Sequence, residues 1–229
     1  MIHNHDINRI KDDGYLVVPL SMAKLASGFG QDPTQCYEML SFFTGKLETF
    51  SNDVIFLYTT GLYLNTADIA YEKRVKLNQQ AQQHARELRK LIEVKKDFIP
   101  SSIHYLPIDY VILNSDFANY FSLIKKRLLL DAGLREAIAH DSHGRDVTEG
   151  QENFILEESI VAHIIRQKLC PLPRTLVKTD AWRLISYPGA ALETDKYLHT
   201  QNLLPKQSGN PFASGVYDFE SRVFVNFEN

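Results

Sequence analysis

Two hydroxyl side chains stand where predicted strands end. Ser21 directly follows Tyr15–Leu20 (YLVVPL), a short apolar run typical of a buried strand, and Tyr187 ends a second such run at 182–187 (WRLISY). Ligands of α/β folds bind outside the carboxyl ends of parallel strands. A serine there can act as a nucleophile, and a tyrosine can assist proton transfer. The alternative is that Ser21 caps a turn and Tyr187 only packs, since the sequence offers neither a GxSxG elbow nor a Ser-His-Asp set by spacing.

Two carboxylates, Glu157 and Glu158, form a third candidate group, in a predicted helix over residues 152–168. Ile155 and Val161 must face the core for this helix to pack, which draws at least one of the carboxylates into a partly buried setting. An unpaired buried carboxylate is costly, so it should meet a cationic ligand or partner. The alternative is a glutamate at the helix edge in water.

Metal-binding, disulfide and phosphate-binding signatures are missing. The sequence has no HExxH, no GxxxxGK[ST], and no GxGxxG after the first strand. His140, Asp141 and His143 fall in a polar segment that we interpret as a solvated loop rather than a metal site. Cys36 and Cys170 are far apart and in no CxxC arrangement, which argues against a disulfide framework or a cysteine zinc site. We expect neither a metal nor a cofactor.

Charge is unevenly distributed along the chain. The net charge is −3, but residues 70–97 carry eight bases and four acids, so this segment is +4 and the remainder is −7. The bases are Lys73, Arg74, Lys76, Arg86, Arg89, Lys90, Lys95 and Lys96, and the acids are Glu72, Glu87, Glu93 and Asp97. A basic element on an acidic body is what electrostatic binding of a polyanion requires. The alternative is a solvated helix face.

Strands and helices alternate in the predicted order of elements. Strands are expected at 15–20, 54–58, 103–106, 182–187 and 222–227, and helices from Asp32-Pro33 onward and at 66–94, 116–140 and 152–168. Alternation of this kind predicts an α/β fold, a Rossmann-like three-layer α/β/α domain with a mostly parallel sheet. The length of 229 residues predicts one domain, 1–229, with its core at about 15–200.

Bulk properties indicate a soluble protein. Hydrophobic residues make up 44% of the chain, which is enough for a packed core, and no apolar run approaches the roughly 20 residues of a membrane span. Residues 1–13 are polar and lack the apolar stretch of a signal peptide. We therefore expect a cytoplasmic location and no membrane partner.

Taken together, four segments resemble the tRNA-dependent cyclodipeptide synthases. VVPLSMAK, with Ser21, resembles the strand that leads to the family's catalytic serine, and residues 70–97 resemble its basic helix. NFILEES, with Asn153, Phe154 and Glu158, resembles its helix with the pattern NY-x3-E. ISYPG, with Tyr187 and Pro188, resembles its strand that ends in Tyr-His or Tyr-Pro. Their order and spacing hold over about residues 15–200. The resemblance implies a fold similar to the catalytic domain of class I aminoacyl-tRNA synthetases and a monomer that acts on charged tRNA.

The resemblance also implies a reaction. The HIGH and KMSKS signatures of the synthetases are absent, which fits an enzyme that takes amino acids already activated as tRNA esters. Ser21 would form an aminoacyl-enzyme, a second aminoacyl-tRNA would extend it to a dipeptidyl-enzyme, and ring closure would release a diketopiperazine. Glu158 would hold the first ammonium, and Tyr187 would assist proton transfer near Ser21. The basic helix would grip tRNA phosphates, principally through Lys73, Arg74, Lys76, Arg86, Arg89 and Lys90.

Several positions depart from the family's usual pattern or divide it. Lys24 and Pro188 match the subfamily that lacks an Asn and His pair. Phe154 and Phe117 stand where tyrosines are usual, with Tyr120 as a possible substitute for the second. Pro19 stands where glycine is usual. Apolar walls are expected from Val17, Pro19, Ile108, Val161, Ala162 and Ile185, which favours hydrophobic substrate side chains.

Two other functions remain open. One is a related transferase that passes the aminoacyl group to a different acceptor amine, which the phenylalanines at 154 and 117 favour. The other is a non-enzymatic tRNA-binding protein on a degenerate synthetase-like fold. The sequence does not reveal which amino acids are joined.

Overall fold

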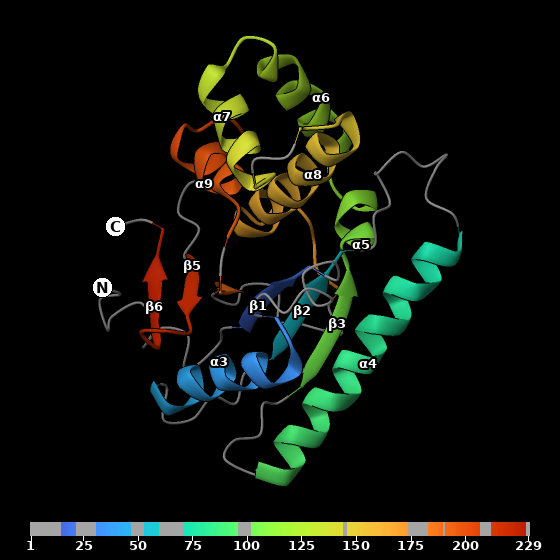
Figure 1. Ribbon diagram of the computed structural model, residues 1–229, viewed down its shortest axis with the longest axis vertical. Helices are drawn as coiled ribbons and strands as arrows, with labels where there is room; N and C mark the ends of the chain where they lie inside the picture. The colour runs from blue at the N-terminus through green and yellow to red at the C-terminus, as the bar shows by residue number, and fades with distance from the viewer. Residues whose placement is uncertain are drawn as a thin grey trace.

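A mixed sheet forms the centre of the molecule (Figure 1). The computed structural model describes residues 15–21, 31–46, 53–59, 71–95, 102–143, 146–173, 183–189, 191–206 and 212–227. Within them the strands are β1 (Tyr15–Leu20), β2 (Val54–Tyr58), β3 (Ile103–Pro107), β4 (Arg183–Pro188), β5 (Phe212–Asp218) and β6 (Val223–Asn226). Their order in the sheet is β3-β2-β1-β4-β5-β6. All neighbouring pairs are parallel except β5 and β6, so the predicted mostly parallel sheet is confirmed.

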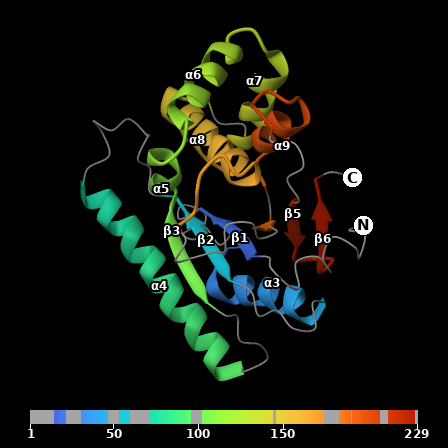
Figure 2. The same ribbon diagram turned by 180° about the vertical axis from the view of Figure 1, so that it is seen from behind.

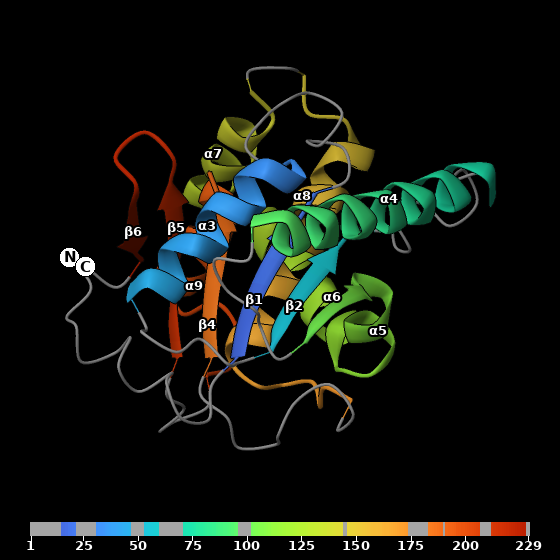
Figure 3. The same cartoon turned by 90° about the horizontal axis from the view of Figure 1, so that it is seen from below.

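Helices cover both faces of the sheet. The described helices are α3 (Pro33–Lys46), α4 (Tyr71–Lys95), α5 (Ile108–Leu113), α6 (Phe117–Leu128), α7 (Ala132–Asp141), α8 (Glu149–Arg166) and α9 (Glu193–Thr200). Side chains of a strand alternate between faces. Val17 therefore packs in one apolar cluster with α5 to α9, while Leu16 and Val18 pack in another with α3 and α4. Figure 2 and Figure 3 show the two helical layers on opposite sides of the sheet, which confirms the three-layer α/β/α prediction.

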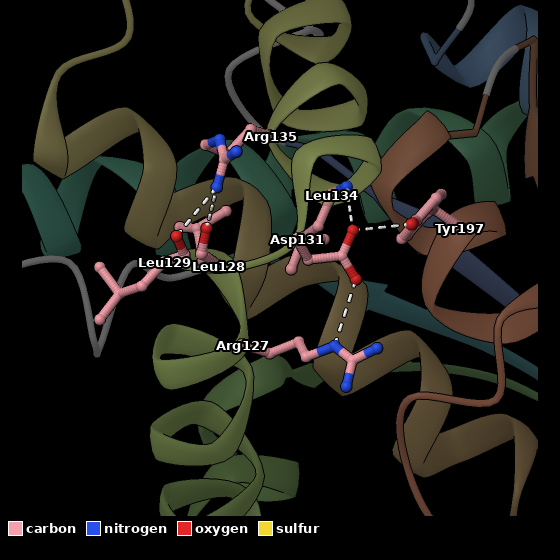
Figure 4. A network of polar contacts seen from close by, with 7 residues as sticks. All are labelled: Arg127, Leu128, Leu129, Asp131, Leu134, Arg135 and Tyr197. Atoms are coloured by element: carbon pink, nitrogen blue, oxygen red, sulfur yellow. Dashed lines mark hydrogen bonds and ion pairs between the residues drawn. The ribbon is translucent and has the colours of Figure 1, made fainter.

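The prediction of one continuous helix over residues 116–140 is wrong, because this segment forms two helices, α6 and α7. Asp131 caps α7 by accepting a hydrogen bond from the Leu134 backbone N–H at 3.1 Å. Arg135 donates to the backbone carbonyls of Leu128 and Leu129 where α6 ends (Figure 4). These local bonds satisfy helix-end groups and so favour two helices over one.

The predicted strand at 182–187 corresponds to β4, and the strand at 222–227 corresponds to β6. Strand β5 lies in a segment for which no element was predicted, because small residues weaken its apolar pattern. Gly215 explains part of this composition. A side chain at Gly215 would begin 2.0 Å from the backbone carbonyl oxygen of Val225 in β6, so the close approach of these strands requires glycine.

Helix α9 was also missed, and contacts with α7 fix its position. The Asp141 carboxylate accepts hydrogen bonds from the backbone N–H groups of Glu193 and Thr194, both at 2.8 Å, and so caps the first turn of α9 from another helix. On the outer side of α9, the Tyr197 hydroxyl donates to Asp131 at 2.8 Å (Figure 4). Within the described ranges, no helix is both long and apolar enough to cross a membrane.

Among the described residues, three histidines are buried in the two helical layers: His84 on α4, His163 on α8 and His199 on α9. Burial lowers the pKa of each imidazole to about 4. The ordinary pKa of histidine is about 6.5. The folded protein therefore keeps these side chains neutral under conditions in which the unfolded chain begins to protonate them.

We expect the free energy of unfolding to fall as the pH drops from about 6.5 to about 4. The unfolded chain takes up protons through this window and the folded protein does not, so the stability contributed by the neutral histidines is fully present above it and is lost on acidification. Urea unfolding at a series of pH values measures the effect.

His163→Gln is the matched variant for this prediction. The Nε2 of His163 lies 2.8 Å from the Pro205 carbonyl oxygen, and a glutamine amide can still donate there but cannot titrate. The variant should lose less stability than the parent between neutral and acidic pH. Equal loss in the two proteins would contradict the role assigned to His163.

Candidate active site

A pocket lies at the carboxyl ends of the central strands. It brings together Ser21, Glu158 and Tyr187, the three residues predicted from the sequence to carry chemistry. The full lining is Pro19, Leu20, Ser21, Gln31, Leu57, Thr59, Ile108, Glu158, Val161, Ala162, Tyr187, Leu192 and Asp195. Four of the six predicted apolar walls, namely Pro19, Ile108, Val161 and Ala162, are among these residues.

The sheet topology explains why Ser21 and Tyr187 meet. Strand β1 lies between β2 on one side and β4 on the other, so the strand order reverses direction at the β1–β4 boundary. Ligand sites of open α/β sheets lie outside the strand ends at such a switch point. Ser21 follows β1 and Tyr187 lies near the end of β4, so both belong to this position.

The backbone pairing of β1 with β4 ends before Pro19, at the pocket. Leu16 donates its N–H to Asp53, and Leu20 accepts from the N–H of Thr59, so even-numbered residues of β1 direct their backbone groups toward β2. Odd-numbered residues then face β4. The pairing of β1 with β4 runs from Tyr15 to Val17, and the next odd residue, Pro19, has no N–H to continue it.

The side chain of Gln31 accepts a hydrogen bond from the backbone N–H of Ser21. The Ser21 N–H, the next group on the β4 side, donates to Gln31 Oε1 at 2.7 Å. The Gln31 carbonyl in turn lies 3.1 Å from Nε2 of His84 on α4, and Nδ1 of His84 lies 2.7 Å from the Tyr105 hydroxyl. A carbonyl only accepts, so Nε2 carries the proton and Nδ1 accepts from Tyr105. Ser21 is thereby held in a buried position, 7% exposed.

Glu158 reaches the pocket from α8. Its Oε1 accepts a hydrogen bond from the Thr59 hydroxyl at 2.7 Å, which joins the end of β2 to the helix. Glu158 is partly buried, and its neighbour Glu157 is fully buried. The prediction that at least one of the two carboxylates is partly buried is therefore confirmed. The alternative, a glutamate at the helix edge in water, is not observed for either residue.

Tyr187 is bound to a buried ion pair. Its hydroxyl donates to Asp195 Oδ2 at 2.8 Å, and Arg166 Nη2 donates to the same oxygen at 2.5 Å. Arg166 and Asp195 are 0% and 1% exposed, and Arg166 also donates through Nε to the Ser214 hydroxyl at 3.3 Å. Burial and the Asp195 charge raise the pKa of Tyr187 well above its ordinary value, so the phenol is protonated at neutral pH.

The sequence reasoning missed Asp195 and Arg166. Asp195 lies in α9, for which no helix was predicted, so its side chain could not be assigned to a face. Arg166 does give a signal, because it stands four residues after Ala162 on a predominantly apolar helix and so shares a face with a pocket wall. A guanidinium on a buried helix face requires a carboxylate partner, but the sequence does not say which one.

Four other residues that were predicted to bind substrate are not among the residues that line the pocket. Val17 and Ile185 are neighbours across β1 and β4 and are buried in the core. Phe154 is partly buried on α8, one turn before Glu158. Phe117 is fully buried at the start of α6, with its ring 5.7 Å from that of Phe121.

Two further predicted residues concern the subfamily assignment. Pro188 is buried in β4 and lies opposite Tyr217 of β5. Lys24 lies outside the described residues.

Basic side chains line the outer face of α4, which runs beside the edge strand β3 (Figure 2). Lys76, Arg86, Arg89 and Lys90 are exposed, Arg74 is partly buried, and the side chain of Lys73 lies outside the described part. A hollow between α4 and β3 combines cationic, aromatic and amide groups; its lining is Tyr58, Ala81, Gln82, Ala85, Arg86, Arg89, Ile103, His104 and Tyr105. Such a surface suits a nucleic acid better than an apolar ligand.

Metal-binding groups do not gather in the part of the chain that the structure describes. There, no three or more His, Cys, Asp or Glu side chains are placed to hold an ion. Asp141, which the sequence assigned to a polar loop, instead ends α7 and caps α9. Cys36 and Cys170 are free and buried.

No protein-family model and no curated protein matches the sequence. The structure does resemble solved ones. A cyclodipeptide synthase from Candidatus Glomeribacter gigasporarum bound to Phe-tRNAPhe matches with a TM-score of 0.56 and 15% identity, over 90% of this chain and 88% of that one. A cyclodipeptide synthase from Bacillus thermoamylovorans matches with a TM-score of 0.54 and 8% identity, over 93% and 91% of the two chains.

A third similar structure links this fold to the synthetases. It is a Mycobacterium tuberculosis protein whose structure is described as demonstrating that cyclodipeptide synthetases are related to type I tRNA synthetases. It matches with a TM-score of 0.50 and 15% identity, over 92% of this chain and 87% of that one. The chain therefore has the Rossmann-like fold that the cyclodipeptide synthases share.

Proposed function

We propose that the chain is a tRNA-dependent cyclodipeptide synthase that works through a covalent intermediate on Ser21. The observation that carries the proposal is the meeting of Ser21, Glu158 and Tyr187 in one pocket. Ser21 directly follows β1, Glu158 lies on α8 and Tyr187 lies in β4, and each belongs to a sequence motif of its own. Their convergence at the switch point of the sheet is what an active site in this fold requires.

The reaction begins with attack of the Ser21 hydroxyl on the ester of the first aminoacyl-tRNA. The serine ester forms, the ester bond to the tRNA breaks, and the hydroxyl proton is delivered to the departing tRNA oxygen. The ammonium of the bound aminoacyl group loses one proton to solvent, and the resulting amine attacks the ester of a second aminoacyl-tRNA. The amide bond forms, the ester bond to that tRNA breaks, and the second proton of the amine goes to the departing tRNA oxygen, which gives a dipeptidyl-enzyme and a second free tRNA. Attack of the terminal amine on the serine ester closes the ring and restores Ser21.

Glu158 provides the negative charge for the amine. An aminoacyl group bound to Ser21 carries an ammonium, and a partly buried carboxylate in the same pocket attracts it more strongly than one in water. Thr59 holds one carboxylate oxygen in place, so the group is oriented before substrate arrives. Pro19, Leu57, Ile108, Val161, Ala162 and Leu192 give the pocket apolar walls, which favour an apolar substrate side chain.

The outer face of α4 serves as the tRNA surface. Its exposed cations can neutralise phosphates, a contribution that depends on salt and is largely indifferent to base sequence. Two charged tRNAs are consumed for each product, by a monomer in the cytoplasm. Pro188 after Tyr187 supports assignment to the subfamily that lacks the Asn and His pair.

Bacteria expressing the protein should release cyclic dipeptides, and a Ser21→Ala culture should not. Alanine keeps the backbone bond to Gln31 and removes the attacking oxygen. Mass spectrometry of the two media measures the difference and identifies the amino acids joined. A different aminoacylated amine would favour the rival transferase. Matching media from two folded, soluble proteins, with no aminoacyl adduct on Ser21, would rule out covalent catalysis.

Glu158→Gln should reduce product formation by about tenfold or more while tRNA binding is unchanged. Glutamine keeps an oxygen that can accept from Thr59 but loses the charge that attracts the ammonium. Thr59→Val is the matched control, since it removes the hydrogen bond and keeps the carboxylate, and it should cost less. Full turnover by Glu158→Gln would show that its charge has no role.

Reversing the charges of Arg86, Arg89 and Lys90 to glutamate should weaken loading of Ser21 by at least about tenfold near physiological salt and flatten its salt dependence. A control with the same change in net charge reverses Lys126, Lys206 and Arg222, which are exposed and lie outside α4. Loading rates at several salt concentrations compare the two proteins. Equal loading by both would exclude α4 as the tRNA surface.

A further inference from the structure

The hydroxyl hydrogen of Tyr187 points away from the chemistry expected at Ser21. It is donated to Asp195 Oδ2 at 2.8 Å, deep in the molecule. A phenol has one O–H to donate and oxygen lone pairs that accept. With its hydrogen engaged by Asp195, Tyr187 can offer a ligand only its lone pairs.

The same geometry opposes a proton relay through Tyr187. Such a relay would move the phenolic proton onto Asp195 while the phenol oxygen took a proton from the pocket. Arg166 Nη2 lies 2.5 Å from the receiving oxygen, and a guanidinium at that distance stabilises the ionised carboxylate and disfavours the protonated one. The ion pair therefore favours a fixed phenol over one that shuttles protons.

We propose that the buried Arg166–Asp195 ion pair fixes the Tyr187 hydroxyl so that its oxygen serves the pocket as a hydrogen-bond acceptor for the aminoacyl ammonium. This inference rests on the proposed function. An ammonium carries three N–H donors and can bond to Tyr187 and Glu158 together, both of which line the pocket. Asp195 and Arg166 are then positioning residues that act through Tyr187.

The contacts of the two pocket carboxylates support this division. Asp195 lines the pocket, but its charge is matched by Arg166 at 2.5 Å. Glu158 accepts a hydrogen bond from the Thr59 hydroxyl. The Asp195 carboxylate, bound by both Arg166 and Tyr187, is thus suited to orient the tyrosine.

Helix α9 carries a natural control. Two residues after Asp195, the Tyr197 hydroxyl donates to Asp131, also at 2.8 Å, on the side of the helix that faces α7 (Figure 4). This second Asp–Tyr bond involves the same groups at the same distance, and neither residue is among the described lining of the pocket. Asp131 also caps α7 and pairs with Arg127, so its replacement tests what the loss of structural contacts outside the pocket does to the protein.

The first experiment measures single-turnover loading of Ser21 by mass spectrometry, with charged tRNA and the full chain. Asp195→Asn should slow loading by at least about tenfold, and Asp131→Asn should change it by less than about twofold. In a Tyr187→Phe background, Asp195→Asn should have no further effect, since Asp195 acts through the missing hydroxyl. An Asp195 effect that persists undiminished in that background would overturn the proposal.

A second variant guards against misfolding, because Asp195→Asn leaves Arg166 buried without its anionic partner. Arg166→Met combined with Asp195→Leu replaces the ion pair by apolar side chains of similar size, an exchange that buried pairs often tolerate. It removes the acceptor of the Tyr187 hydroxyl and should slow loading as Asp195→Asn does. Loading at the parental rate by this folded variant would contradict the proposal.

A spectroscopic readout is independent of activity. The charged and titratable groups around the Tyr187 hydroxyl are Asp195, Arg166 and Glu158. In protein labelled with 13C at the tyrosine ζ carbon, the signal assigned by Tyr187→Phe should stay unchanged through the pH range in which a free tyrosine ionises. Asp195→Asn leaves the positive Arg166 beside the phenol, so the pKa of Tyr187 should fall and its titration should appear at lower pH than in the parent.

The outcomes separate this inference from the proposed function. If the parent protein never loads Ser21, the synthase function fails, and the Tyr187 titration alone decides whether the ion pair holds the hydroxyl. If the parent loads but Asp195→Asn loads equally well and leaves the Tyr187 signal unchanged, the pair only joins α8 to α9. Asp131→Asn should move the Tyr197 signal and leave that of Tyr187 in place.

Discussion

Arg166 and Asp195 are two charged side chains in the apolar layer between the sheet and α8, and each depends on the other to be there. Removal of either would leave a buried charge without its counter-ion, at a cost of several kcal/mol. The pair also joins separate parts of the fold, since it binds Tyr187 in β4 and Ser214 in β5. The positions of α8, α9 and the two strands are thereby coupled at one point beside the pocket.

Helix α9 is held on more than one side around this pair. Asp141 caps its first turn, Tyr197 bonds to Asp131 on the outer side, and Asp195 bonds inward. A short helix gains little stability from its own backbone hydrogen bonds, so tertiary contacts of this kind must supply it. The position of the wall that α9 contributes to the pocket is consequently set by contacts with α7, α8 and β4, which suits a site that orients a reactive group.

The sequence was informative where function follows local pattern. Ser21 and Tyr187 could be placed together because strand ends of a parallel sheet meet at one edge, and Glu158 because an apolar helix draws in its carboxylates. The break between α6 and α7 depends on a cap at Asp131 that a continuous apolar pattern conceals. The partner of Arg166 could not be predicted, since Asp195 lies 29 residues away and pairing at that range is decided only by the fold.

At the pocket, Pro19 affects the backbone pairing of β1, whereas apolar lining residues of other elements contribute their side chains. The backbone pairing of β1 with β4 ends at Val17, before the imino acid Pro19, and this end of the ladder lies beside the pocket. Ile108, Val161 and Leu192, which come from other elements, only shape the pocket. Their replacement can therefore retune which molecules fit without disturbing the serine, and the scaffold is free to diversify its substrates one wall at a time.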